Sequence, residues 1–318
     1  MDISKIKFRF KQFGSWRLLR SYYKIGVLST SIKEFMRVII THRPLKEAYP
    51  AVRRKIVPIL QRRYAPLLKE LCNKYDKEDL DHHKGDIVWF CWMQGLDQAP
   101  ALVKACHASL KRFIKDKRII VVDGDNYKDY VTIPEEMIEK HKKGIIPYAH
   151  FSDFIRLELL IRYGGTWIDS TVLCVNKDYP KEMMDCDLFF FQYLSEDNNK
   201  SQGISNWFIS ASSNNKILMI LRDLLYQYWH DYDCLLDYYV FHLFFNMIAK
   251  YYPAEIQAMP RQNSWNAVKM VFHLKDKHSN GLMNYFKMCS SFHKLDYRVR
   301  VDNPDSLYYH MLNEYNLL

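Results

Sequence analysis

The pattern of apolar and polar positions changes character near residue 80. Beyond that point, short apolar runs rich in β-forming residues alternate with stretches of helical spacing. The runs at 86–93 and 118–122 predict buried strands, and residues 101–113 between them predict an amphipathic helix. A strand, a helix and a second strand in this order predict the start of a parallel α/β sheet.

A second strand–helix pattern follows at residues 149–175. Ser152 is expected to cap a helix that runs to Tyr163, because its hydroxyl can accept a free N–H group of the first turn. Gly164 and Gly165 then end the helix, since glycine adopts the left-handed conformation at little cost.

Polar side chains in this segment are spaced so that they can act together. Asp153 and Arg156 are three residues apart and share one face of the predicted helix. Residues 167–175 are expected to form a strand, on which Asp169 and Thr171 point to the same side.

Before residue 80, apolar residues alternate irregularly with basic ones within 16–27 and recur at helical spacing within 32–40, and a further segment of apolar and basic residues runs over 51–71. Residues 72–85 are polar and are expected to be a linker. The sequence therefore predicts an N-terminal helical region, residues 1–80, followed by an α/β domain, residues 81–318.

Charge separates the same two parts of the 318-residue chain. Residues 1–70 hold 17 Lys and Arg against 4 Asp and Glu, whereas residues 71–318 hold 29 against 32. A basic amphipathic helix fits an anionic membrane surface and a helical subdomain with a solvated basic face equally well. Nucleic-acid binding is the least favoured interpretation, because no known nucleic-acid-binding motif accompanies the charge.

Composition is that of a globular protein with a sizeable core, at 48% apolar and 26% charged residues. The longest apolar stretch, residues 235–249, contains Asp237, His242 and Asn246 and so does not reach the roughly 18 apolar residues of a spanning helix. No secretory signal is evident at the N-terminus. The 7 cysteines include no Cys-x-x-Cys pair, which favours a reducing cytoplasm over a disulfide framework or a zinc site.

Ligands of parallel α/β sheets bind beyond the carboxyl ends of the strands. Two such ends are predicted at residues 92–95, which begin with Trp92, and at residues 123–126, which end with Asn126. Both are candidates for ligand contact.

Several ordered motifs resemble glycosyltransferase family 32, and most closely its capsular polysaccharide synthesis branch. The central motif is Ser152-Asp153-x-x-Arg156 followed by Gly164-Gly165-Thr-Trp-Ile-Asp169-Ser-Thr171. The segments IVWFCWMQG near the start and Ser291-Phe-His293-Lys294-Leu295 near the end also resemble that branch. The resemblance spans about residues 86–296.

This resemblance implies a GT-A fold, a Rossmann-like domain that binds a nucleotide sugar. It implies that Trp92 stacks on the nucleobase and that Asn126 touches the nucleoside. It also implies that Asp153 and Arg156 hold sugar hydroxyls, that Gly165 lies in the donor-binding motif, and that Asp169 lies near the ribose. Lys294 would face the diphosphate, and the sugar would be transferred with retention of its anomeric configuration.

The sequence departs from the family pattern at one of the positions that would bind a metal. Thr171 stands where the family typically has the second aspartate of Asp-x-Asp, and a hydroxyl is a poor ligand for a hard cation. The resemblance implies a divalent metal, Mn²⁺ or Mg²⁺, held by Asp169, Thr171 and His293. The departure leaves the need for that metal open.

The acceptor side is expected among aromatic surroundings, at Asn206, Trp207, Asp237 and His242. We expect a hexosyltransferase that uses a UDP-sugar and builds a lipid-linked surface or capsular polysaccharide. It would be cytoplasmic and peripheral on the inner membrane face, with no nucleic-acid partner. The alternative is a non-catalytic membrane- or nucleic-acid-binding protein that retains a degenerate GT-A fold.

Overall fold

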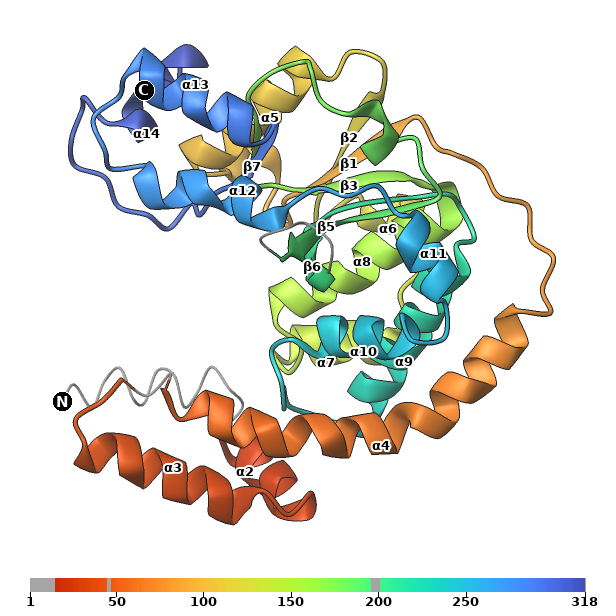
Figure 1. Ribbon diagram of the computed structural model, residues 1–318. Coiled ribbons are helices and arrows are strands. Elements are labelled where there is room, and N and C mark those ends of the chain that lie inside the picture. Colours follow the sequence, from red (N-terminus) through yellow and green to blue (C-terminus); the bar gives the residue numbers. More distant parts are fainter. Residues whose placement is uncertain (1–14, 45–46, 196–200, 318) are drawn as a thin grey trace. The chain divides into compact units, whose positions relative to one another are not determined.

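The computed structural model describes residues 15–44, 47–195 and 201–317 (Figure 1). Its contacts divide the chain into two compact units. The first comprises residues 1–79, 133–154 and 216–253, and the second comprises residues 80–132, 155–215 and 254–318. The domain boundary expected at residues 80–81 stays a prediction, because compactness does not test whether a part folds alone.

The second unit contains the α/β sheet that the sequence predicted. Five strands lie in the order β2-β1-β3-β6-β5. Their bounds are β1 Ile87–Cys91, β2 Arg118–Val122, β3 Gly165–Asp169, β5 Leu188–Leu194 and β6 Ser201–Ala211. β2 and β3 run parallel to β1, and β6 runs antiparallel to both β3 and β5. The mixed α/β fold with an N-terminal helical region is thus confirmed.

Alternation along the strands gives the sheet two buried faces. Val88 and Phe90 of β1 pack with Val103 and Leu110 of helix α5, Ala101–Phe113, on one face. Trp89 points to the other face, where its ring contacts Tyr130 of α6 and Tyr163 of α8. Both faces are therefore closed to water, as is usual for parallel strands.

A smaller sheet completes the second unit. β4, Val172–Cys174, pairs antiparallel with β7, Phe292–Lys294. Their apolar side chains pack with α5 and with the C-terminal helices around Met270, Phe286 and Met311. The remaining helices of this unit are α6 Tyr127–Tyr130, α12 Ser264–Val268, α13 Asn280–Cys289 and α14 Leu307–Glu314, with 3₁₀ turns at Leu96–Gln98, Lys181–Met183 and Lys269–His273.

The first unit is helical. Its helices are α2 Ser15–Lys24, α3 Leu28–Ile40, α4 Tyr49–Tyr75, α7 Glu135–Lys142, α9 Lys216–Asp231 and α10 Val240–Ile248, while α8 Tyr148–Tyr163 and α11 Pro253–Ala258 each belong partly to both units. α3 and α4 contain the stretches predicted at 32–40 and 51–71, whereas the stretch predicted at 16–27 is helical only to Lys24, because the chain turns at residues 25–27.

Helix α4 is held to the rest of the first unit by paired polar contacts. Tyr64 donates a hydrogen bond to Asp231 at 2.8 Å, and Tyr75 donates one to Asp223 at 2.6 Å, both on α9. Arg53 donates one to the fully buried Asp237 at 2.9 Å. Of the basic residues of α4, Arg53 and Arg63 therefore pair with carboxylates of the same unit, while Arg54, Lys55, Arg62 and Lys69 are exposed.

Three local predictions are wrong. The linker expected at 72–85 begins only after Tyr75, because residues 72–75 are the last turn of α4 and bury Cys72 and Tyr75. Helix α8 begins at Tyr148 after Pro147, so Ser152 lies inside it and its hydroxyl donates to the carbonyl of Ala149 instead of capping. The strand predicted over 167–175 is broken by a turn at residues 170–171, because β4 leaves the large sheet to pair with β7.

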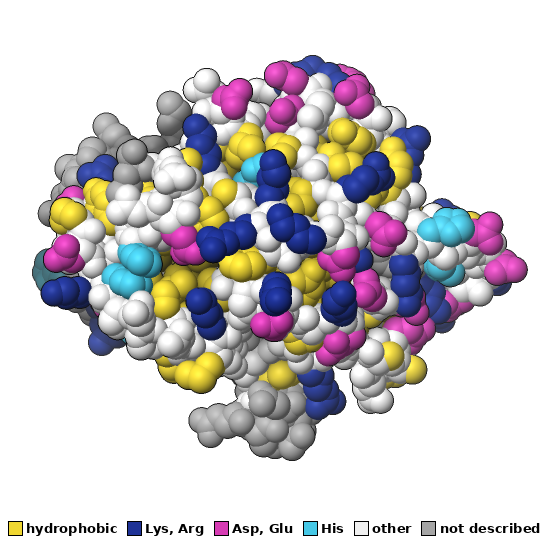
Figure 2. All heavy atoms as spheres, turned by 90° about the horizontal axis from the view of Figure 1, so that it is seen from above, with side chains coloured by type: hydrophobic (Ala, Val, Ile, Leu, Met, Phe, Trp, Pro, Cys, Tyr) yellow, Lys and Arg dark blue, Asp and Glu magenta, His cyan; other side chains and the backbone are white. Residues whose placement is uncertain are grey.

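Two further observations concern the apolar length of the helices and the charge of one surface. Within residues 15–44, 47–195 and 201–317, no helix is both long and apolar enough to cross a membrane. On the face shown in Figure 2, side chains of both charges are interspersed with hydrophobic ones.

The step from α8 into β3 depends on glycine. Gly164 and Gly165 have φ values of 65° and 90°, in the left-handed region. A Cβ atom at Gly165 would lie 2.4 Å from the carbonyl oxygen of Ile87. Only glycine lets the chain reverse here while β3 stays paired with β1, so this pair places Asp169 at the end of β3.

Gly165→Ala is expected to destabilise the protein by about 2 kcal/mol or more, because it adds a backbone clash to an unfavourable φ. Gly144→Ala is the matched control. Gly144 also has a positive φ, of 66°, but open space surrounds its Cβ position, so its cost should stay near 1 kcal/mol. Urea unfolding of the two variants measures the difference, and equal losses would contradict the close approach of β1 and β3.

Candidate functional site

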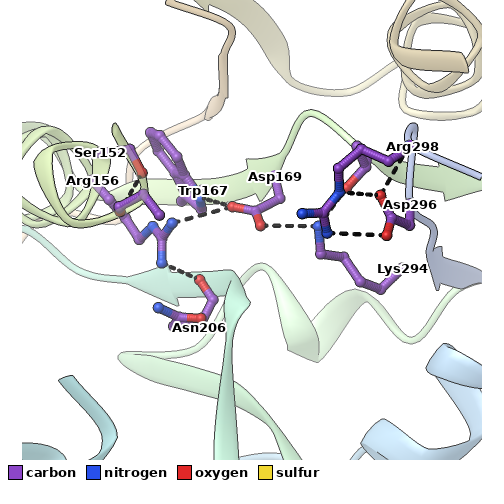
Figure 3. Close-up of polar contacts among 10 residues, drawn as sticks. Ser152, Arg156, Trp167, Asp169, Asn206, Lys294, Asp296 and Arg298 are labelled. Carbon is purple, nitrogen blue, oxygen red and sulfur yellow. Dashed lines mark hydrogen bonds and ion pairs between the residues drawn. The ribbon is translucent and has the colours of Figure 1, made fainter. Parts of the chain in front are cut away.

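The candidate site is centred on Asp169, the last residue of β3 (Figure 3). Its Oδ1 accepts hydrogen bonds from Nε1 of Trp167 at 2.9 Å and from a guanidinium nitrogen of Arg156 at 3.2 Å. Its Oδ2 lies 3.2 Å from the Nζ of Lys294. One carboxylate thus lies between two cationic side chains that come from α8 and β7.

These neighbours set the ionisation of Asp169. Burial alone would raise the pKa of its carboxyl group, but the charges of Lys294 and Arg156 oppose this and hold the pKa below its ordinary value. Asp169 is therefore ionised at neutral pH. With two cations around one anion, the three side chains carry a net charge of about +1.

Arg156 is almost fully buried and is fixed on several sides. Besides Asp169, it donates to the backbone carbonyl of Asn206 on β6 at 2.6 Å. Its guanidinium carbon lies 4.8 Å from the centre of the Trp167 ring, within the range of a cation–π contact. A side chain held this way has little freedom left to lose when it binds a ligand.

Lys294 bridges the two sheets. Its ammonium group donates to the hydroxyl of Thr171 and lies beside Asp169. Asp169 ends the large sheet, and Thr171 lies in the turn just before the small sheet. Thr171, one of the predicted metal ligands, therefore accepts a hydrogen bond from a lysine ammonium here.

Asp153 lies one helical turn before Arg156 on α8. It is buried, and one of its carboxylate oxygens lies 3.8 Å from Nδ1 of His150 on the same helix. Asp153 and Arg156 thus lie three residues apart on one helix, as the sequence predicted. Their role toward a sugar stays a prediction.

The carboxyl ends of β1, β2 and β3 lie along one edge of the sheet, with Asp169 at the end of β3. Cys91 of β1 pairs with both Val122 of β2 and Asp169 of β3, so the residues that follow each strand lie along one edge. Trp92 follows β1 there. Its Nε1–H is buried without a hydrogen-bond acceptor among the described residues, and its ring meets Tyr297 edge-on at 5.3 Å.

The side chain of Asn126 forms hydrogen bonds within the loop after β2. Its side-chain oxygen accepts from the backbone N–H of Asp123 at 2.9 Å, and its amide nitrogen donates to the carbonyl of Val121 at 3.0 Å. These bonds shape the turn. A contact between Asn126 and a nucleoside stays a prediction.

The residues predicted to bind a metal do not fit one as arranged. The ammonium of Lys294 engages both Asp169 and Thr171. His293 precedes Lys294 on β7, so its side chain lies on the opposite face of that strand, and its Nε2 lies 2.9 Å from the carbonyl of Ser290 and 3.1 Å from that of Phe286. Across the described part of the chain, no group of three or more His, Cys, Asp and Glu is placed to hold a metal ion.

The predicted acceptor residues lie in different surroundings. Asn206 meets Arg156 through its backbone, while Trp207 is buried in the core and stacks on Phe191 at 4.4 Å. Asp237 and His242 lie in the first unit, where Asp237 accepts from Tyr49 and Arg53. Their acceptor role stays a prediction.

Sequence reasoning missed Trp167 and Tyr297. Trp167 holds Asp169 through its indole N–H and lies against Arg156. The period of two along a strand was the available signal, since it puts Trp167 and Asp169 on the same face. No local pattern links Tyr297 to Trp92, because their contact depends on the tertiary fold.

Comparison with known proteins gives the following. The family described as capsular polysaccharide synthesis protein matches residues 37–312, which is most of the chain. No curated protein matches it. Among solved structures, "PaToxG Glycosyltransferase" is similar at 13% identity and a TM-score of 0.38, over 64% of this chain and 83% of that chain. A superposition at this TM-score is too loose to assign function.

The buried position of His293 predicts a pH effect on stability. Burial lowers the pKa of His293 to about 4, whereas in the unfolded chain it is about 6.5. The unfolded state therefore binds a proton that the folded state does not, and stability falls as pH falls from about 6.5 to about 4, by about 3 kcal/mol in all.

Urea unfolding between pH 7.5 and pH 4.5 (roughly the window set by these pKa values) measures this loss. His293→Gln should remove its contribution, whereas His83→Gln, at an exposed position, should leave the pH dependence unchanged. Identical pH profiles for His293→Gln and the unaltered protein would contradict the prediction.

Proposed function

Because the chain belongs to the capsular polysaccharide synthesis protein family, we propose that it is a glycosyltransferase of the family 32 type. It would move a hexose from a nucleotide-sugar donor to a growing surface or capsular polysaccharide. The observation that carries this proposal is the Arg156–Asp169–Lys294 group at the carboxyl edge of the sheet.

The charge of this group suits the diphosphate of a donor. Two cations and one carboxylate leave a net positive charge, and the side chains of Asp169 and Lys294 are 24% and 28% exposed. A ligand can therefore reach them. The partly buried setting strengthens their interaction with an anion, since water screens it less than at an open surface.

The chemistry needs this charge when the bond to the sugar breaks. The departing nucleoside diphosphate gains negative charge, and a fixed cation nearby stabilises it. Lys294 would supply that cation, with Asp169 and Thr171 holding its ammonium in place. Arg156 and Asp153 would hold sugar hydroxyls by directed hydrogen bonds.

Transfer with retention is part of the proposal. In that mechanism a phosphate oxygen of the donor takes the proton of the acceptor hydroxyl, so no side-chain base is required. The surroundings of Asp169 agree with this assignment, because its pKa is lowered and an ionised carboxylate bound by two cations is a weak base.

The donor is proposed to be a UDP-sugar bound along the carboxyl edge. Trp92 would contact the nucleobase, and its buried indole N–H could donate to a carbonyl there, removing the cost of an unsatisfied donor. Asn126 and the backbone at Gly165 would line the nucleoside side. These roles follow from the family resemblance and from the shared sheet edge.

The acceptor is proposed to be a lipid-linked glycan at the inner membrane face, with the chain peripheral on that membrane. Asn206 and Trp207, on β6 of the second unit, are the proposed acceptor-side residues. The basic N-terminal helices would give the protein its attraction to anionic lipid.

Nucleotide binding tests the function and the need for a metal together. At a UDP concentration about 100 times Kd, the folded state gains about 2.7 kcal/mol, which raises the melting temperature by several degrees. We expect this rise with UDP, more than with GDP, CMP or ADP, and we expect it to persist with a chelator present. We expect no need for a metal because the ammonium group of Lys294 already lies beside Asp169 and Thr171, two of the three predicted metal ligands.

Lys294→Met should weaken UDP binding about 10- to 100-fold, the value of a hydrogen bond to a charged group. Lys287→Met, which removes an exposed lysine from α13, is the matched control and should bind normally. Each shift is measured against the melting temperature of the same variant without nucleotide. A rise in melting temperature that requires Mn²⁺ would instead support a metal-dependent enzyme. No change in melting temperature with any nucleotide would favour a non-catalytic binding protein.

A further inference from the structure

Helices α2 and α3 present large apolar side chains to solvent. On α3, Ile32, Met36 and Ile40 follow one another at intervals of four residues, and Phe35 lies beside them. On α2, Trp16 and Tyr23 are seven residues apart and share one face. The exposed fractions of these side chains reach 78% at Trp16 and 70% at Ile40.

We call these exposed apolar side chains of α2 and α3 the stripe. Both helices also have side chains that are buried. Tyr22, Val27 and Val38 are buried within the first unit. The thiol of Cys234 donates to the hydroxyl of Ser21 at 3.2 Å, which ties α2 to the chain after α9. The stripe is therefore an outward face of a folded element.

Basic side chains surround the stripe. Residues 15–44 contain 6 Lys and Arg but only 1 acidic residue, Glu34. All six are exposed: Arg17, Arg20, Lys24, Lys33, Arg37 and Arg43. Arg37 pairs with Glu34 and Arg43 with Glu47, whereas the other four form no ion pair within the described residues.

We infer that α2 and α3 bind in the plane of an anionic lipid surface, with the stripe at the boundary of the hydrocarbon and the basic residues among the phosphates. This inference rests on the membrane placement in the proposed function and names the surface that provides it. Helices with one apolar face and one basic face bind membranes in this way. Trp and Tyr, such as Trp16 and Tyr23, favour the membrane interface.

Charge favours lipid over a second copy of the chain. Two copies meeting through this face would bring six cationic side chains against six more, and like charges brought together repel. An anionic bilayer instead offers negative charge for the basic residues and hydrocarbon for the apolar ones.

Vesicle flotation of the full chain, without nucleotide, tests the inference. Vesicles of phosphatidylcholine mixed with phosphatidylglycerol are compared with vesicles of phosphatidylcholine alone. The unaltered protein should bind the anionic vesicles and should bind the neutral ones much more weakly.

The charge variant is Arg20→Gln, Lys24→Gln and Lys33→Gln in one chain. Each basic residue near an anionic surface is worth about a fivefold change in binding, so this variant should bind about 100-fold more weakly. Its control is Lys111→Gln, Lys275→Gln and Lys287→Gln, which removes the same charge from exposed positions of the second unit and should change binding little.

The apolar variant is Ile32→Ser, Met36→Ser and Ile40→Ser, which should weaken binding about tenfold or more. Its control is Phe272→Ser and Met288→Ser, at exposed apolar positions of the second unit. If the triple variant melts early, Ile40→Ser alone, at the last residue of α3, replaces it and should still weaken binding.

Two outcomes would overturn the inference. One is binding that neither the charge variant nor the apolar variant changes. The other is a dimer in lipid-free light scattering that the apolar variant dissociates, which would assign the face to a second copy. Because the nucleotide shifts are measured without vesicles, failure here is distinct from failure of the proposed chemistry.

Discussion

The ionic grouping around Asp169 is the interaction on which the second unit depends most. A partly buried carboxylate is costly unless it is paired, and its partners come from three different elements: α8, β3 and β7. Pairing the charge therefore fixes the end of the large sheet relative to the start of the small one. The contacts that stabilise this junction are also the contacts that hold Lys294 at the edge where ligands of α/β sheets bind.

Among the described basic residues of the N-terminal region, two on α4 are paired with carboxylates, whereas the others on that helix are exposed. On α4, Arg53 and Arg63 meet the carboxylates of Asp237 and Asp231, and tyrosines on the same helix bind carboxylates of α9. On α2 and α3, most of the basic side chains face solvent beside exposed apolar ones. Within the described residues, the charge excess thus includes two cations paired on a packed helix and others exposed on α2, α3 and α4, which composition alone could not separate.

Local periodicity predicted elements whose apolar side chains pack into the core along their whole length. The helix at 101–113 and the strand at 118–122 have the bounds that their apolar spacing indicated. Prediction failed where distant pairing decides the structure. The break at residues 170–171 arises because β4 pairs with β7, which lies far along the chain. For His293 and Lys294 the sequence held an unused signal, since neighbours on a strand face opposite ways and could not both serve one ligand.

The bridge from Lys294 to Thr171 spans 123 residues of sequence, and this separation has a consequence for the order of assembly. As the chain is synthesised, β1, β2 and β3 are complete by residue 169 and can pair early, whereas β4 must wait for β7 at residues 292–294. Long-range pairing of this kind slows folding, because closing a large loop loses entropy before any contact is gained. Until β7 arrives, Asp169 has only Trp167 and Arg156 beside it, so the junction between the sheets is a late event in the maturation of the nascent polypeptide.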